Sequence, residues 1–506
     1  MSVAALARSI IAVGFEGNCI ADAPLEELRA FAPGAITLFG RNVGPADALR
    51  ALVAGLRGIE TLPPLIAVDQ EGGRVARIGE VVAQLPSAMA VGAARDVDAC
   101  ERLGRLLGRD LAQLGVSVDF APVGDCALDP ENTVIGTRAY GSDPLLVGRF
   151  AGAFARGLEA GGVAAALKHF PGHGSTAVDS HLALPRVTLD EATFRSRDLL
   201  PFAAAISGEA AQIVMAAHVV VEAFDAQNPA SLSPRILTGL LRDELGFEGV
   251  AATDCLQMDA IARAPGTVAG AVAALAAGAD LLLVSHSLAV AREAAEAIAA
   301  AVDAGTIPRE RLEQAAVRVR ALRERYATLQ PYGGELDAAL PLAVAQRAVT
   351  VLRGTLRLRD ERPVTVISFE GDAFDGAGGV RTERPSLSTA LRARRWKSEV
   401  MRVALDPDDD DIDLLLGHLP SLGDRNFVIT VRRAHLYPRQ RAAVARILAL
   451  IPGAAIVSAA EPYDALLWPA ARTVAAIYGD DAVAFAACAD VLSGRAEAAG
   501  LLPVPI

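Results

Sequence analysis

The sequence has few cysteines, no excess of positive charge and no long hydrophobic run. Its five cysteines form no C-x-x-C pair, which argues against a zinc ribbon or a disulfide framework and favours a reducing compartment. Its net charge of −12 argues against a function dominated by contacts with nucleic-acid phosphates. No apolar stretch is long enough to span a bilayer, and the first residues do not read as a signal peptide. We therefore expect a cytoplasmic protein without nucleic-acid or membrane partners, and the sequence makes no prediction of its oligomeric state.

The composition indicates a large protein of mixed helices and strands. With 506 residues, the chain is long enough for two to four domains with sizeable cores. Hydrophobic residues make up 52% of it, while aromatic residues make up only 5%. Such a composition excludes a disordered chain and is typical of a helix-rich α/β protein.

Short apolar runs recur through the first two-thirds of the chain, and stretches with helical periodicity separate most of them. The runs lie at 10–13, 35–39, 65–68, 116–120, 164–167, 213–217, 250–252 and 281–284. Buried strands that alternate with helices indicate a parallel sheet. Eight such runs in roughly 300 residues predict a (β/α)8 barrel, with an open doubly wound sheet as the alternative.

Ionisable residues follow four of these runs directly or after one residue. They are Asp69, the pair Lys168 and His169, His218, and Asp254. Any one of them could cap a helix, Asp69 and Asp254 especially. The carboxyl ends of barrel strands, however, meet at one mouth, where barrel enzymes place their active sites. Four such positions therefore predict a catalytic site at the barrel mouth.

The barrel pattern ends after a helical stretch at 307–328. The segment Gln330-Pro331-Tyr332-Gly333-Gly334 is typical of a linker. Further apolar runs follow at 364–369, 428–431, 454–457 and 474–477, with a helical segment at 439–450. We predict a catalytic barrel over 1–328, a linker over 329–350 and a smaller α/β/α sandwich over 351–506. The acidic run at 406–413 predicts a solvated loop without a function.

The segment 168–174 (KHFPGHG), with Asp179 and His181 shortly after it, concentrates histidine and charge beside a predicted strand. Only seven histidines occur in the chain. Asp179 and His181 stand two apart, so both side chains can project from one face of an extended segment. A carboxylate can then fix the imidazole tautomer and leave the other ring nitrogen free for proton transfer. We interpret this pair as a candidate acid/base dyad, with capping or surface residues as the alternative.

A metal site is a competing interpretation of the same histidines. His169, His173 and His181 could supply nitrogen ligands. His169 and His173 are four residues apart, but Pro171 and Gly172 between them argue against a helix that would align them. No cysteine lies in this segment. We therefore predict no metal and no cofactor.

Several motifs together resemble the bacterial β-N-acetylglucosaminidases of glycoside hydrolase family 3. The segment 168–174 with Asp179-Ser180-His181 is similar to the signature of that group, and 68–75 (VDQEGGRV) is similar to a second family segment. The stretches 38–42, 119–123, 134–138, 241–254 and 486–504 also resemble family members. The likeness covers most of the chain, and it is weakest between about 355 and 470.

The resemblance implies a retaining glycosidase. In it, Asp254 would be the nucleophile that forms a covalent glycosyl-enzyme. His181, oriented by Asp179, would protonate the departing oxygen and then activate water. The remaining site residues would hold a terminal N-acetylglucosamine (GlcNAc) of peptidoglycan fragments or related glycosides; they are Asp69, Arg138, Lys168 and His169.

The sequence departs from the family pattern beside the proposed nucleophile. Family members commonly carry a second acidic residue there, as in S-D-D-L-x-M, whereas this chain has Thr253-Asp254-Cys255. Three alternatives stay open at this stage. The chain could be a phosphorylase of β-N-acetylglucosaminides, since a neutral imidazole base would not repel phosphate. It could act as a β-glucosidase, or be a sugar-binding protein without catalysis.

Overall fold

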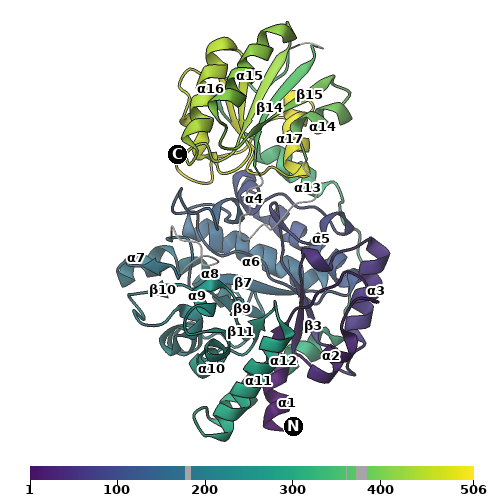
Figure 1. Ribbon diagram of the computed structural model, residues 1–506, viewed down its shortest axis with the longest axis vertical. Helices are drawn as coiled ribbons and strands as arrows, with labels where there is room; N and C mark the ends of the chain where they lie inside the picture. Colours follow the sequence, from purple (N-terminus) through teal and green to yellow (C-terminus); the bar gives the residue numbers. More distant parts are fainter. Residues whose placement is uncertain (177–183, 360–361, 372–384) are drawn as a thin grey trace.

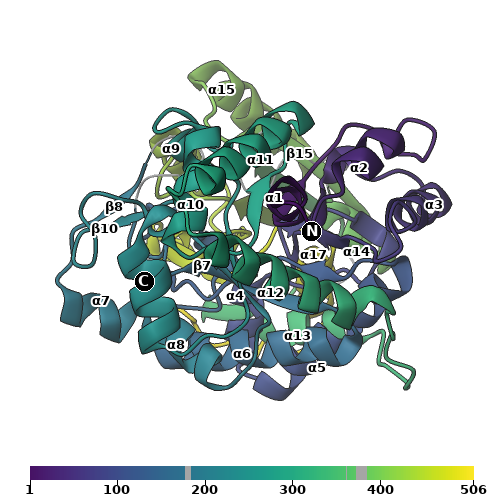
Figure 2. The same ribbon diagram turned by 90° about the horizontal axis from the view of Figure 1, so that it is seen from below.

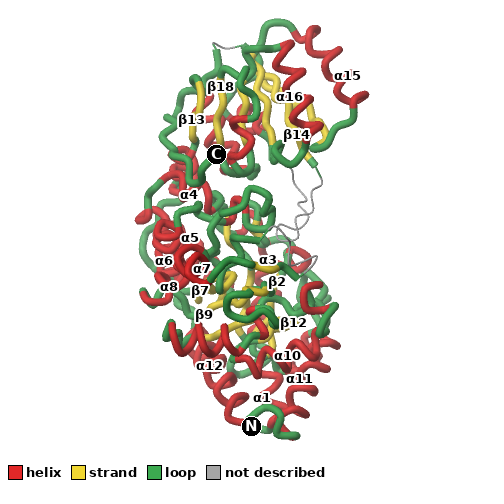
Figure 3. The backbone as a smooth tube through the Cα atoms, turned by 90° about the vertical axis from the view of Figure 1, so that its left-hand side faces the viewer, coloured by secondary structure: helices red, strands yellow, loops and turns green. Residues whose placement is uncertain are grey.

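The computed structural model describes residues 1–176, 184–359, 362–371 and 385–506. A larger N-terminal part and a smaller C-terminal part lie one above the other (Figure 1). The N-terminus lies at the far end of the larger part, and the C-terminus lies near the boundary between the two (Figure 3). No helix in the described part of the chain is long and apolar enough to cross a lipid bilayer.

The larger part contains a parallel eight-stranded sheet in the order β11-β9-β7-β6-β3-β2-β1-β12. Its strands are β1 (Ile11–Val13), β2 (Ala35–Leu38), β3 (Leu65–Val68), β6 (Val118–Asp119), β7 (Ala164–Phe170), β9 (Ile213–Ala216), β11 (Val250–Thr253) and β12 (Leu282–Val284). A parallel bridge between Ala252 and Leu281 joins the first and last strands of this order and closes the barrel. The predicted barrel is confirmed, and the open sheet is wrong.

All eight predicted runs form strands because each carries apolar side chains that are buried inside the barrel or under its helices. The main barrel helices are α1 (Val3–Ser9), α2 (Leu25–Phe31), α3 (Ala46–Arg57), α4 (Ala88–Ala94), α5 (Val97–Leu114), α6 (Pro144–Gly161), α7 (Glu191–Arg197), α8 (Leu200–Ser207), α9 (Asp259–Ala262), α10 (Thr267–Ala277), α11 (Leu288–Asp303) and α12 (Arg309–Ala327). A π-helix, η5 (Arg235–Glu244), precedes β11. The view from below shows helices around the strands (Figure 2).

The smaller part is a six-stranded sheet in the order β13-β18-β17-β16-β14-β15, with only β13 antiparallel to its neighbour. Its strands are β13 (Thr350–Arg353), β14 (Val364–Glu370), β15 (Ser398–Ala404), β16 (Asn426–Val431), β17 (Ala455–Ser458) and β18 (Thr473–Ala476). Its helices are α13 (Leu340–Ala348), α14 (Leu387–Ala393), α15 (Asp409–His418), α16 (Pro438–Leu450) and α17 (Ala482–Leu492).

Helices cover both faces of this second sheet. Side chains of α14 and α17 share one apolar cluster with the sheet, and side chains of α15 and α16 share another. The predicted α/β/α sandwich is thereby confirmed. The sequence prediction missed β13 and β15, the two edge strands. Their side chains are mostly only partly buried or exposed, so neither forms a continuous apolar run.

The acidic run at 406–413 is not a loop throughout, so this prediction was wrong. Helix α15 begins at Asp409, and Asp408 caps it by accepting a hydrogen bond from the N–H of Asp411 at 2.8 Å. Asp409, Asp410 and Asp411 occupy its first turn. Carboxylates are favoured at a helix N-terminus because they interact with its unpaired N–H groups and with the positive end of its dipole.

The two parts share an apolar cluster at their boundary. It contains Met89 and Ala90 of α4, Ile135 of the barrel, and Ala476 and Tyr478 of the second part. The hydroxyl of Ser87 donates to the carbonyl of Tyr478 at 2.6 Å. The segment 329–350, expected as a linker, includes helix α13, which packs against α4. The second domain therefore lies against barrel loops, a contact that matters for the site below.

Candidate active site

The barrel brings three of the predicted ionisable positions to the carboxyl ends of its strands. Asp69 directly follows β3 and Asp254 directly follows β11. Strand β7 is longer than expected and runs to Phe170, so Lys168 and His169 lie within it. In the sheet, β9 alone separates β7 from β11, and β6 alone separates β7 from β3. These side chains therefore share one mouth of the barrel.

A buried ion cluster joins Lys168 and Arg138 through Glu71. The Nζ of Lys168 lies 2.6 Å from Oδ1 of Asp69 and 2.7 Å from Oε1 of Glu71. Arg138 donates to both oxygens of Glu71, from Nε at 2.8 Å and from Nη2 at 2.7 Å. The side chains of Lys168, Glu71 and Arg138 are 3%, 6% and 5% exposed. Only Asp69, at 21%, is open to the mouth.

The interactions in this cluster keep Glu71, Lys168 and Arg138 charged at neutral pH. Burial would raise the pKa of Glu71, but the charges of Arg138 and Lys168 outweigh burial and hold that pKa well below its usual range. Burial would lower the pKa of Lys168, but Asp69 and Glu71 raise it. Two cations and two carboxylates therefore compensate one another in a region where an unpaired charge would be costly.

His169 extends the cluster and has a defined tautomer. Its Nε2 lies 3.3 Å from Nη2 of Arg138, and its Nδ1 lies 2.6 Å from Oδ2 of Asp125. A guanidinium can only donate, so Nε2 accepts and the ring proton resides on Nδ1, where it is donated to Asp125. Both ring nitrogens thus have protein partners, and His169 accepts from the same Nη2 of Arg138 that donates to Glu71.

Asp125 was not predicted as a site residue from the sequence, and Glu71 was given no role. Asp125 is fully buried and also accepts from the N–H groups of His169, at 3.1 Å, and His173, at 2.6 Å. Burial would raise the pKa of Asp125, but its interactions with His169 and His173 lower it. Its signal was an acidic residue shortly after an apolar run, the same signal that identified Asp69. Glu71 lay within the motif 68–75.

Asp254 lies two strands from this cluster and is half-buried. Its Oδ1 accepts from the N–H of Cys255 at 2.7 Å, and its own N–H donates to the carbonyl of Ala216 at 2.9 Å. His218, the remaining predicted ionisable position, is fully buried. Its Nε2 donates to the carbonyl of Cys255 at 2.9 Å and its Nδ1 lies 2.7 Å from the Ser231 hydroxyl. His218 therefore fixes the backbone that follows Asp254.

Asp179 and His181, the predicted acid/base pair, lie outside the described residues. The chain just before them is anchored: the N–H of His173 is bound to Asp125, and the side chain of Asn132 donates to the carbonyl of His173 at 3.0 Å. In the described ranges, no three His, Cys, Asp or Glu side chains are grouped in a way that could hold a metal ion.

Comparison with known proteins identifies the family. The family model described as "Glycosyl hydrolase family 3 N terminal domain" matches residues 12–322, which include the barrel sheet from the second residue of β1 to the end of β12. The chain belongs to glycosyl hydrolase family 3. The family prediction and the expectation of a glycoside hydrolase are confirmed.

Among family 3 proteins, the chain is similar to a solved β-N-acetylglucosaminidase from Paenibacillus sp. str. FPU-7. The two share 32% identity with a TM-score of 0.92, over 100% of this chain and 99% of the other. A "Beta-hexosaminidase" of Chromobacterium violaceum is 39% identical over 325 residues, which are 62% of this chain and 89% of the relative. "Beta-hexosaminidase A" of Pseudoalteromonas piscicida is 34% identical over 375 residues, 65% of this chain and only 61% of the relative.

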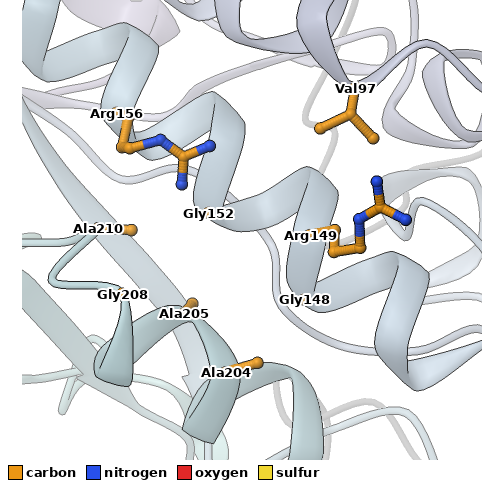
Figure 4. A pocket seen from close by; sticks show the side chains of 9 residues that line it. All are labelled: Val97, Gly148, Arg149, Gly152, Arg156, Ala204, Ala205, Gly208 and Ala210. Carbon is orange, nitrogen blue, oxygen red and sulfur yellow. The ribbon is translucent and has the colours of Figure 1, made fainter.

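A hollow of about 340 Å³ lies elsewhere on this family 3 barrel, between α6 and α8 (Figure 4). Its lining consists of Val97, Gly148, Arg149, Gly152, Arg156, Ala204, Ala205, Gly208 and Ala210. Arg156 pairs with Glu101 at 3.2 Å, and both arginines are exposed. The hollow shares no residue with the charged cluster and holds no carboxylate, so it is not a glycosidase site.

The side chain of Cys255, the departure from the family pattern, is bound to Ser285. Its Sγ accepts from the Ser285 hydroxyl at 3.1 Å, and burial raises the pKa of its thiol. The backbone N–H of Cys255, and not its side chain, is bound to Asp254. The thiol therefore remains neutral and contributes no charge to the site.

This geometry predicts that the Cys255 side chain is dispensable for catalysis. Replacing Cys255 with alanine is expected to leave kcat on an aryl glycoside within about threefold, because the N–H bound to Asp254 is retained. Loss of the buried sulfur should lower the free energy of unfolding by about 1 kcal/mol. Steady-state kinetics and urea unfolding check both values. A fall in kcat of more than tenfold would contradict this account.

The buried imidazole of His173 should make the stability of the protein depend on pH. Burial lowers its pKa to about 4, against about 6.5 in an unfolded chain. Between these pH values the unfolded chain binds a proton that the folded chain does not, so the free energy of unfolding falls as pH falls. The stability of the unchanged chain should decline more steeply from pH 6.5 to 4 than that of a His173→Gln variant, by up to about 3 kcal/mol. Urea unfolding at pH 7, 5.5 and 4 measures this, and parallel curves would refute it.

Proposed function

We propose that this chain is a retaining exo-β-N-acetylglucosaminidase that removes terminal GlcNAc through a covalent intermediate on Asp254. One observation carries the proposal: a carboxylate at the end of β11 faces the same barrel mouth as the buried cluster of Asp69, Glu71, Lys168 and Arg138. In this arrangement the cluster would hold the sugar while the carboxylate of Asp254 attacks its anomeric carbon.

The cluster supplies what recognition of a sugar requires. Asp69 is open to the mouth and can accept hydrogen bonds from sugar hydroxyls, whereas Lys168 and Arg138 can only donate. Their fixed partners leave little freedom, so the sugar would meet preorganised groups. We assign recognition of the non-reducing GlcNAc to Asp69, Lys168 and Arg138, with His169 fixing the guanidinium of Arg138.

The acid/base step is assigned to His181 with Asp179, on the strength of the sequence motif. The imidazolium would protonate the departing oxygen, and the neutral ring would then remove a proton from water as it attacks the anomeric carbon. The choice of an N-acetylated sugar is supported by the names of the relatives, which include a β-N-acetylglucosaminidase aligned over 99% of its length. We further propose peptidoglycan fragments as the natural substrate.

Hydrolysis of paired aryl glycosides tests this function. The expected result is that p-nitrophenyl β-N-acetylglucosaminide is cleaved with a kcat/KM at least about 100-fold above that of the β-glucoside, a preference that hydrogen bonds to the acetamido group can supply. Added phosphate should not change the rate or yield a sugar phosphate. A preference for the glucoside would make the chain a β-glucosidase, and phosphate-dependent turnover would make it a phosphorylase. Failure to cleave either glycoside would overturn the proposal.

The natural substrate needs a separate comparison. Release of GlcNAc from a GlcNAc-anhydromuropeptide should be faster than from chitobiose at equal concentration if peptidoglycan fragments are the substrate. Chromatography of both reactions over time gives the two rates. Faster cleavage of chitobiose would indicate that chitin fragments, and not peptidoglycan fragments, are the natural substrate. The proposed mechanism would be unaffected.

A further inference from the structure

The second domain contacts the loop that carries Arg138. Glu461 begins the short helix η7 (Pro462–Leu466) after β17, and its side chain is 4% exposed. Its Oε1 accepts a hydrogen bond from the backbone N–H of Thr137 at 3.3 Å. Thr137 and Arg138 belong to one turn of 3₁₀ helix, η3 (Gly136–Arg138). A carboxylate of the second domain is thus bound one residue before a proposed sugar-binding arginine.

Arg433 holds this carboxylate in place. It donates to both oxygens of Glu461, from Nε at 3.0 Å and from Nη2 at 3.1 Å. The same Nη2 reaches the carbonyl of Thr133 in the barrel loop at 3.3 Å. Burial would raise the pKa of Glu461, but the charge of Arg433 outweighs burial and lowers that pKa to about 2. Glu461 therefore remains an ionised, well-oriented acceptor at any physiological pH.

Gly136 shows how closely the loop and the carboxylate fit. Its φ is +42°, in the left-handed region that favours glycine. A Cβ at this position would lie 1.9 Å from Oε1 of Glu461, far inside contact distance. Any side chain at 136 would therefore displace the carboxylate or the loop.

Residues of the barrel also hold this loop. Arg74 donates to the carbonyls of Thr133, Val134 and Ile135 at 2.8, 2.6 and 3.2 Å. Asn132 Oδ1 accepts from the N–H groups of Val134 and Ile135. Barrel residues thus bind the first half of the loop, whereas the N–H of Thr137, nearest to Arg138, is bound by the second domain.

We propose that Glu461 is a positioning residue through which the second domain sets Arg138 for sugar binding. The inference rests on the proposed function, because it assigns the consequence to the affinity for GlcNAc. Glu461 touches neither the sugar nor Asp254 in this account. Its loss should therefore weaken binding in the ground state and the transition state alike, which raises KM and leaves kcat nearly unchanged.

Kinetics of Glu461→Ala in the full chain test the proposal. KM for p-nitrophenyl β-N-acetylglucosaminide is expected to rise about tenfold, with kcat within about threefold of the unchanged protein. Glu461→Gln keeps one oxygen for the N–H of Thr137 and should raise KM by less. Gly136→Ala should reproduce the rise in KM, and the double variant Gly136→Ala/Glu461→Ala should raise KM by less than the product of the two single effects, because both disturb one contact.

The matched control removes a different ion pair across the same boundary. Arg347 of α13 lies 3.0 Å from Asp96 at the start of α5. In the described part of the chain, it makes no hydrogen bond to the 132–138 loop. Arg347→Ala should leave KM within twofold. The proposal is overturned if KM of Glu461→Ala equals that of this control, or if kcat falls while KM is unchanged. If the alanine variant does not fold, the same limits apply to Glu461→Gln and Gly136→Ala.

The same experiments distinguish a failure of this positioning role from a failure of the proposed function. If the unchanged protein does not cleave the GlcNAc glycoside, the proposed function fails and the kinetic comparison has no baseline. If it does cleave the glycoside and Glu461→Ala behaves as the control, only the positioning role fails. Calorimetric titration with free GlcNAc gives a second readout, in which the affinity should fall by the same factor as KM rises.

Discussion

Replacing Asp254 with asparagine is expected to lower kcat for the GlcNAc glycoside by at least about 10⁴-fold, a loss typical of a removed nucleophile. The change keeps the size of the side chain and its acceptor oxygen for the N–H of Cys255, so the fold should be preserved. Binding should persist, because the charged cluster around Lys168 is untouched. KM and the midpoint of thermal unfolding should therefore change little.

Covalent trapping provides the direct measurement for Asp254. A 5-fluoro analogue of GlcNAc with a good leaving group should slow hydrolysis of the intermediate, so that a peptide containing Asp254 carries the sugar mass. The Asp254→Asn variant should gain no such mass, whereas Cys255→Ala, its neighbour and matched control, should be labelled. A label on another carboxylate, or a kcat of Asp254→Asn within tenfold of the unchanged protein, would exclude Asp254 as the nucleophile.

Replacing Glu71 with glutamine is expected to give the largest loss of stability among single changes at the site, about 3–5 kcal/mol. Glu71 accepts from Arg138 twice and from Lys168 once, and all three side chains are nearly inaccessible to solvent. A neutral amide offers a single acceptor oxygen and places two N–H donors beside these cations. Within the cluster, Asp69 would then be the one remaining carboxylate for two buried positive charges, those of Lys168 and Arg138.

Urea unfolding measures this loss, and an exposed ion pair supplies the control. Arg309 and Glu313 lie 2.8 Å apart on α12, with side chains 54% and 46% exposed. Glu313→Gln should change the free energy of unfolding by no more than about 0.5 kcal/mol, because solvent screens exposed pairs. A Glu71→Gln variant as stable as this control would show that the buried cluster does not require its carboxylate.

The stability contributed by Glu71 also has a pH dependence of known sign. The pKa of its carboxyl is depressed in the folded chain, so the folded state favours the ionised form. This contribution is present above the pKa of the unfolded chain, about 4.3, and is lost as pH falls toward the folded value. The difference between the unchanged protein and Glu71→Gln should therefore shrink on acidification below about pH 4.

The sequence determined the barrel and the positions of its active residues because both depend on local pattern. Each apolar run had the length and burial of a strand, and an ionisable residue after a parallel strand lies at the carboxyl edge whatever the rest of the fold does. Asp69, Lys168 and Asp254 were found in this way. The acidic run at 406–413 was wrongly predicted as a loop. A run of charges is typical of a solvated loop, but carboxylates also occupy the first turn of a helix, as they do in α15.

The partners of those residues were decided by the tertiary structure alone. Asp125 reaches His169 across 44 residues, Glu71 reaches Arg138 across 67, and Glu461 reaches Thr137 across 324. No spacing in the sequence encodes such contacts, because they arise only when strands of the closed barrel and the second domain come together. Local pattern thus fixes which side chains face the mouth, and long-range packing fixes which charges they meet there.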